Sequence, residues 1–199
     1  MPFLTRNVTT EADGLATFGR QQVHQIVTTL HALDDQQLRA TPSASELSVG
    51  AIAHHVLAVV DGNAHEIERA TARAARAVIG DEPVIHAPGE DDDPELGDPS
   101  LSVPDGATAA TLGAALEQAG TRLEEALRAA DLDAPVPTPE APWYTGAEDW
   151  NVRWLALHTI EEVARHAGQA DVIRESIDGK GAYELNALTD GETWPPAGW

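Results

Sequence analysis

The sequence predicts an all-α fold in the form of a four-helix bundle. Four long segments repeat apolar residues every three or four positions, as helices with one buried face do. No segment of useful length alternates polar and apolar residues as a strand does. Amphipathic helices of this length bury their apolar faces most simply by packing as a bundle. We expect one domain over residues 1–199, since this length suits a single hydrophobic core.

The four helices are expected at residues 10–34, 45–79, 107–130 and 149–178. Threonine and serine residues before the first two helices are typical N-caps, and glycines after the second and fourth are typical helix ends. The apolar stripe of the first helix consists of Leu15, Phe18, Val23, Ile26, Leu30 and Leu33.

The longest connection, residues 81–106, is predicted to be an acidic loop. It contains nine acidic residues, five prolines and no Lys or Arg, and prolines at these intervals prevent a helix. A solvated loop is the favoured interpretation. A cation-binding loop is the alternative, although the Asp91–Asp93 run lacks the spacing and the glycine of a calcium loop. The C-terminal tail, residues 180–199, is aperiodic and is expected to pack over the bundle.

The composition disfavours several function classes. With 33 Asp+Glu against 12 Lys+Arg, the net charge is −21, which opposes binding to nucleic acid and to anionic lipid. No apolar run reaches the roughly 20 residues of a membrane span, and the N-terminal residues do not resemble a signal peptide, so we expect a cytoplasmic protein. Cysteine is absent, so a metal site would have to use His, Glu and Asp.

The fourth predicted helix carries the most informative run of residues. His158, Glu162 and His166 follow one another at intervals of four, which places them on one helix face with about 6 Å between neighbouring Cβ atoms. Glu162 and His166 could therefore bind one ion together. Because the surrounding residues are apolar, these side chains need a partner to offset the cost of burial.

The second predicted helix offers that partner in His54 or His55. Adjacent helical residues point about 100° apart, so only one of the two histidines faces the interior. His55 shares a stripe with Ile52 and Val59 and is our choice. The pattern gives the hypothesis of a divalent metal held by His55, Glu162 and His166, with an open position typical of catalysis. The alternative is an ordinary hydrogen-bonded His–Glu pair.

Catalytic roles are assigned to His158 and Arg165. His158 is a further metal ligand, a residue that orients a ligand, or a substrate contact. Arg165 and Arg153 are candidates for binding a substrate carboxylate, although Arg165 could instead pair with Glu161 or Glu162. Trp150 and Trp154 are candidates for the pocket wall. Other histidines are expected at the surface or rim, namely His24, His31 and His65.

The run His158-x-x-x-Glu162-x-x-x-His166-x-Gly168-Gln169-x-Asp171 resembles the last helix of the DinB/YfiT-like superfamily of metalloenzymes. It is most similar to an actinobacterial branch related to mycothiol-dependent maleylpyruvate isomerase and mycothiol S-transferases. The segment Leu47-Ser48-Val49-Gly50-x-x-x-His54-His55-Val56 resembles the second helix of that family. Two positions depart from common patterns: many DinB members have His where Glu162 stands, and the close branch often has His where Gln169 stands.

The resemblance implies a four-helix DinB fold, a homodimer, and one divalent metal ion, zinc or nickel. The metal ligands of the family correspond to His55, Glu162 and His166. The resemblance also implies a transferase or isomerase that joins a low-molecular-weight thiol of the mycothiol type to a small electrophile. The alternatives are a metal-dependent hydrolase with His158 or Glu161 as base, and a non-catalytic metal-binding stress or interaction protein.

Overall fold

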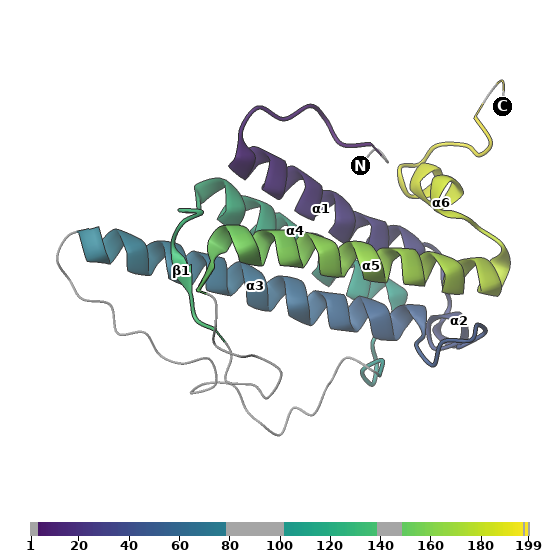
Figure 1. Ribbon diagram of the computed structural model, residues 1–199. Helices are drawn as coiled ribbons and strands as arrows, with labels where there is room; N and C mark the ends of the chain where they lie inside the picture. The colour runs from purple at the N-terminus through teal and green to yellow at the C-terminus, as the bar shows by residue number, and fades with distance from the viewer. Residues whose placement is uncertain (1–3, 79–101, 139–148, 197, 199) are drawn as a thin grey trace.

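Four long helices and two short ones dominate the structure (Figure 1). The computed structural model describes residues 4–78, 102–138, 149–196 and 198. The predicted all-α fold with four long helices is confirmed. The long helices are α1 (Glu11–Thr29), α3 (Val49–Val78), α4 (Ala109–Ala129) and α5 (Val152–Asp178), and the short ones are α2 (Asp35–Leu38) and α6 (Ala182–Thr189).

Polar side chains and one glycine determine where the long helices begin and end. Thr10, Thr108 and Asn151 stand just before α1, α4 and α5, and each side chain accepts a hydrogen bond from the backbone N–H three residues later. Gly179 ends α5 with a φ of 79°, a left-handed conformation that glycine adopts without strain. These signals are readable in the sequence, and the bounds of α4 and α5 lie close to those predicted.

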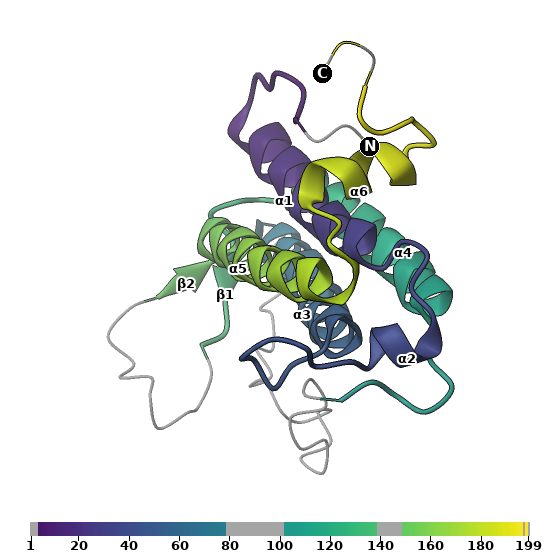
Figure 2. The same cartoon turned by 90° about the vertical axis from the view of Figure 1, so that its right-hand side faces the viewer.

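α1 and α3 occupy opposite corners of the bundle. Each packs along both α4 and α5, whereas α1 and α3 touch each other at few points; the end view in Figure 2 shows this arrangement. Fully buried aliphatic side chains from all four helices fill the interior, among them Ile26, Ile52, Leu123 and Ile173. The packing therefore sets α3 against α5, and the candidate site lies along that contact.

The end of α1 differs from the expectation. The helix ends at Thr29 and not at residue 34, because Ala32 takes a φ of 54° and turns the chain. Asp34 then caps the start of α2 and forms a capping box with Gln37, in which each side chain accepts a hydrogen bond from the backbone N–H of the other residue. The apolar spacing of Leu33 continues the pattern of α1 beyond the point where the helix stops.

The C-terminal tail contains a helix that periodicity does not predict. α6 has eight residues, too few to display a repeat. Tertiary contacts hold it, since Leu185 is fully buried and the Asn186 and Gln25 side-chain amides exchange two hydrogen bonds of 3.1 and 2.9 Å. The expectation of an aperiodic tail is therefore wrong for residues 182–189.

A small antiparallel sheet was also absent from the sequence-based expectation. β1 (Pro135–Val136) pairs with β2 (Trp150–Asn151), with Val136 opposite Trp150. Two residues a strand cannot show alternation, so the pattern carries no signal. Most of the predicted acidic loop, residues 81–101, lies outside the described residues. Within the described part of the chain, no helix combines the length and apolar character needed to cross a membrane.

The burial of two side chains of α1 differs from the expectation. His24, expected at the surface or rim, is buried, and its Nδ1 lies 2.8 Å from Oε1 of Glu117 on α4. Phe18, expected in the apolar stripe, is 45% exposed. The hydrogen bond with Glu117 offsets part of the cost of burying the imidazole, and this partner comes from another helix.

Candidate metal centre

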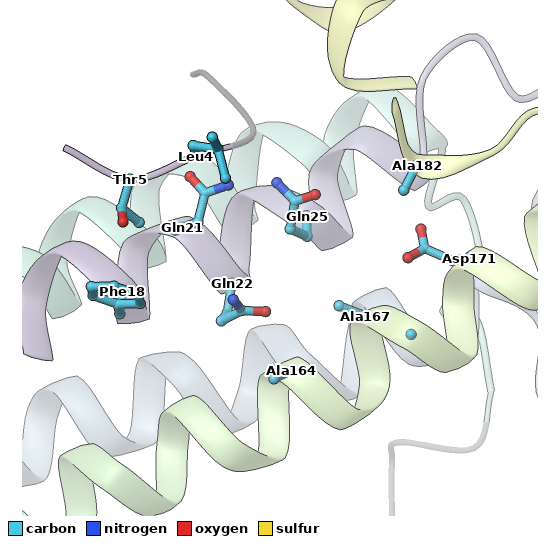
Figure 3. A pocket seen from close by; sticks show the side chains of 11 residues that line it. Leu4, Thr5, Phe18, Gln21, Gln22, Gln25, Ala164, Ala167, Asp171 and Ala182 are labelled. Carbon is cyan, nitrogen blue, oxygen red and sulfur yellow. The ribbon is translucent and has the colours of Figure 1, made fainter. Parts of the chain in front are cut away.

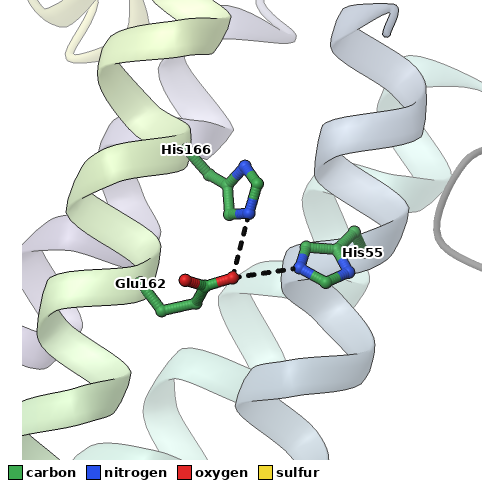
Figure 4. Close-up of side chains that lie close together, drawn as sticks. All are labelled: His55, Glu162 and His166. Atoms are coloured by element: carbon green, nitrogen blue, oxygen red, sulfur yellow. Dashed lines mark hydrogen bonds and ion pairs between the residues drawn. The ribbon is translucent and has the colours of Figure 1, made fainter. Parts of the chain in front are cut away.

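α3 and α5 carry the three side chains of the candidate centre (Figure 4). His55 lies in the second turn of α3, and Glu162 and His166 lie one turn apart in the middle of α5. Each helix presents these residues to the other. The centre thus joins two segments of the chain that meet only through the packing of the bundle.

Two hydrogen bonds between side chains bracket the centre. On one side, Nδ2 of Asn63 on α3 donates to Oγ1 of Thr159 on α5 at 2.9 Å. On the other, Nε2 of Gln169 on α5 donates to Oγ of Ser45, just before α3, at 3.1 Å. These bonds fix the register of α3 against α5, and this register decides which side chains face one another.

The three donor atoms converge on one point. Nε2 of His55 lies 3.3 Å from Oε1 of Glu162, and Nε2 of His166 lies 3.0 Å from the same oxygen. The two imidazole rings meet edge to face, with centroids 4.7 Å apart and an angle of 70° between their planes. One ligand atom from each residue lies within 4.8 Å of the other two. Each side chain is partly exposed, so the centre is reachable from solvent.

The electrostatics of the centre favour an ionised Glu162. Partial burial alone would raise the pKa of this carboxyl group. The hydrogen bond from His55, and the charge and hydrogen bond of His166, lower it by more, so the pKa lies below its usual value. Glu162 is therefore a carboxylate at neutral pH, the form that binds a metal ion.

The sequence model of the mycothiol S-transferase family matches residues 14–179. The chain belongs to the mycothiol S-transferase family. The matched range contains all three donors and most of the four long helices, and the family is DinB-like, as the resemblance of the sequence implied. No curated protein and no solved structure matches the chain.

The donor set of this family member suits a divalent metal ion. Imidazole nitrogens and a carboxylate oxygen are ligands that zinc and nickel accept, and three protein ligands leave room for another molecule. Nδ1 of His166 is buried without a hydrogen-bond partner among the described residues. The polar contact of this ring is therefore at Nε2, the nitrogen that faces His55 and Glu162.

His54 points to a different part of the chain. Its Nδ1 donates to the backbone carbonyl oxygen of Ser102 at 3.1 Å, and it takes no part in the three-residue group. The angle of about 100° between adjacent helical residues accounts for the separation of His54 from His55.

His158 lies outside the group of three and belongs to an aromatic stack. It is exposed, and its ring stacks on Trp154 with centroids 4.9 Å apart and planes at 22°. Trp154 in turn stacks on Trp150 at 3.9 Å and 11°. The stack continues the stripe of Glu162 and His166 toward the start of α5. The spacing of four between the rings was visible in the sequence, but the contact itself was not predicted.

The two candidate arginines differ in their surroundings. Arg153 donates to Glu11 at 2.7 Å and to Asp133 at 2.6 Å, which raises its pKa further and leaves the guanidinium occupied. Arg165 is exposed and pairs with neither Glu161 nor any other described carboxylate. Of the two, only Arg165 has a guanidinium that is available to a substrate.

Proposed function

We propose that this protein is a metal-dependent thiol S-transferase that joins mycothiol, or a similar low-molecular-weight thiol, to a small electrophile. His55, Glu162 and His166 hold one divalent ion, zinc or nickel. The observation that carries the proposal is the convergence of three metal-type donors from two helices in a member of the mycothiol S-transferase family. The side chains are reachable from solvent, as a site for two substrates requires.

The chemistry needs a sulfur nucleophile, and the chain contains no cysteine. The thiol must therefore arrive as a cosubstrate. A divalent ion at this centre would lower the pKa of that thiol, so that thiolate forms near neutral pH. The sulfur then forms a bond to the electrophilic carbon, and the electron pair of the broken bond departs with the leaving group.

His158 receives the proton that the thiol loses. It stands one helical turn before Glu162 on the same face of α5, and the stack on Trp154 holds its ring in place. Its exposure lets the proton pass on to water. The role is that of a general base, and substitution by Gln should lower the rate without removing metal.

Arg165 binds an anionic group of the electrophile. It stands three residues after Glu162, which makes the two side chains neighbours on the surface of α5, and it is exposed. In a chain with 33 acidic residues, an arginine without a carboxylate partner among the described residues is well suited to an external anion.

Adduct formation tests the proposed function. Protein is mixed with mycothiol and a panel of small electrophiles, and the thioether product is measured by mass spectrometry. We expect product from metal-loaded protein. For His166→Ala we expect the rate of product formation to fall at least about 100-fold, because a bound metal ion would lower the pKa of the thiol. Product formed equally fast by metal-free protein and by the variant would contradict the proposal.

A further inference from the structure

A hollow lies beside α5, lined on that helix by Ala164, Ala167, Gly168 and Asp171 (Figure 3). Helical geometry places these residues on the face of α5 opposite to that of Glu162 and His166. The hollow has a volume of about 360 Å³ and lies between α1 and α5, and residues 4–5 and the start of α6 also border it. Its floor on α5 consists of small residues, and a Cβ added to Gly168 would meet nothing within 4 Å. This volume falls at the lower end of the range for small-molecule sites, about 300–1,000 Å³.

Asp171 supplies the only charge among the described side chains that line this hollow. Its carboxyl group points into the space between the two helices (Figure 3). Among the described residues it has no hydrogen bond and no ion pair, and burial, followed by the nearby charge of Glu175, raises its pKa to about 6. An unpaired carboxylate in a partly buried place is costly, and a cation bound beside it would remove that cost.

The other walls suit the remainder of an organic cation. Ala167 and Gly168 stand one turn before Asp171 on α5 and leave room for a hydrocarbon part beside the carboxyl group, whereas Phe18, 45% exposed, borders the opposite end of the hollow (Figure 3). The amide of Gln22 has no hydrogen bond to a described residue, so its carbonyl oxygen can accept from an N–H donor. The amide of Gln25 is already committed to Asn186 and forms a fixed end wall.

We propose that this hollow binds a small organic ammonium ion, whose charge pairs with Asp171 and whose apolar part lies on the small residues Ala167 and Gly168. The chain's net charge of −21 draws cations to the surface and raises their local concentration. A divalent metal ion fits less well, because one carboxylate among amides and alkyl groups supplies too few charged ligands. The site is separate from the transferase centre and does not depend on the proposed function.

Benzylamine, a cation at neutral pH, is the probe that tests this site. Its binding is followed by the backbone amide shifts of the protein in NMR spectra, beside benzyl alcohol and benzoate as neutral and anionic analogues. We expect saturable shifts with benzylamine alone, centred on residues 18–25 and 164–171. Asp171→Asn should weaken binding at least about tenfold, the loss expected for one charge-assisted hydrogen bond. Phe18→Ala, at the opposite end of the hollow, should leave it unchanged.

Two control variants show whether benzylamine binds in this hollow or elsewhere on the protein. Glu125→Gln removes one negative charge from an exposed residue of α4 and should leave benzylamine binding unchanged. His166→Ala should also bind benzylamine as the wild type does, because the candidate metal centre is not involved. Equal affinity in wild type and Asp171→Asn, loss of binding in His166→Ala, or no saturable shift with benzylamine would each overturn the proposal.

Discussion

Nε2 of His55 lies 3.3 Å from Oε1 of Glu162, although 107 positions separate the two residues in the sequence. The contact exists because α3 and α5 pack side by side, with the hydrogen bond between Asn63 and Thr159 fixing their register. Glu162 faces a second histidine, His166, on its own helix. A carboxylate between two imidazoles from different helices is the feature on which the proposed activity depends.

Removal of Arg165 should affect only substrates that carry a negative charge. For Arg165→Ala we expect KM for an anionic electrophile to rise about tenfold, since a charged hydrogen bond is lost. A neutral electrophile should react as before. Arg76→Ala, at another exposed arginine, is the matched control for the change in net charge. A similar fall in rate with both electrophiles would show that Arg165 acts on the centre itself.

Asp171→Asn should stabilise the protein at neutral pH. The pKa of Asp171 in the folded state, about 6, exceeds the ordinary value of 3.8. The folded state thus binds the proton more tightly, and the wild type loses stability as the pH rises from about 4 to about 6. After allowance for partial solvent exposure, the variant should gain about 1 kcal/mol at pH 7.5 and almost nothing at pH 3.5. Urea unfolding at both values checks this, and a gain that does not depend on pH would contradict it.

Asp178→Asn, unlike Asp171→Asn, should destabilise the protein at neutral pH. Burial raises the pKa of Asp178, but hydrogen bonds from Arg174 and Lys180 lower it by more, so that it lies at about 2. The stabilisation is present above the ordinary pKa of 3.8 and is lost as the pH falls through about 2. Arg174 is 1% exposed and keeps bonds to the Thr29 and His31 carbonyl oxygens.

Because Arg174 retains these two backbone partners, Asp178→Asn should lower the free energy of unfolding by about 2 kcal/mol. This is less than the cost of leaving a buried charge without any partner. Thermal unfolding at pH 7 measures it, with Glu192→Gln as a control at an exposed acid. An unchanged melting temperature would mean that the ion pair contributes nothing.

Gly50→Ala should disturb the start of α3. An added Cβ would lie 2.7 Å from Cγ2 of Val103 and 2.8 Å from the Leu38 side chain and carbonyl oxygen. The chain must move to relieve these contacts, at an expected loss of about 1–3 kcal/mol in the free energy of unfolding. Gly62→Ala is the matched control, since its Cβ would meet nothing within 4 Å. Equal stability of the two variants would contradict the close approach.

The sequence predicts the long helices well and the connections poorly, for physical reasons. Helix ends marked by a capping threonine or by Gly179 are legible, whereas the turn at Ala32 has a positive φ without the glycine that usually signals one. The eight residues of α6 are too few to show a period, and its place depends on Gln25, far away in the sequence.

The sequence likewise predicts some features of the candidate site and not others. A spacing of four brings Glu162 and His166 together on any helix, and helical geometry alone separates His54 from His55. The same spacing also occurs in Trp150, Trp154 and His158, so it does not distinguish a ligand from a member of a stack. The hollow beside Asp171 combines four segments of the chain, and no local pattern predicts it.

The metal content of two neighbouring variants tests the central claim most directly. Elemental analysis of the purified wild type should give about one divalent ion per chain, as a single three-ligand site requires. His54→Ala should retain that ion, because His54 bonds to Ser102 and not to the centre. His55→Ala should lose most of it. Equal metal content in the two variants, or loss in His54→Ala alone, would contradict the account.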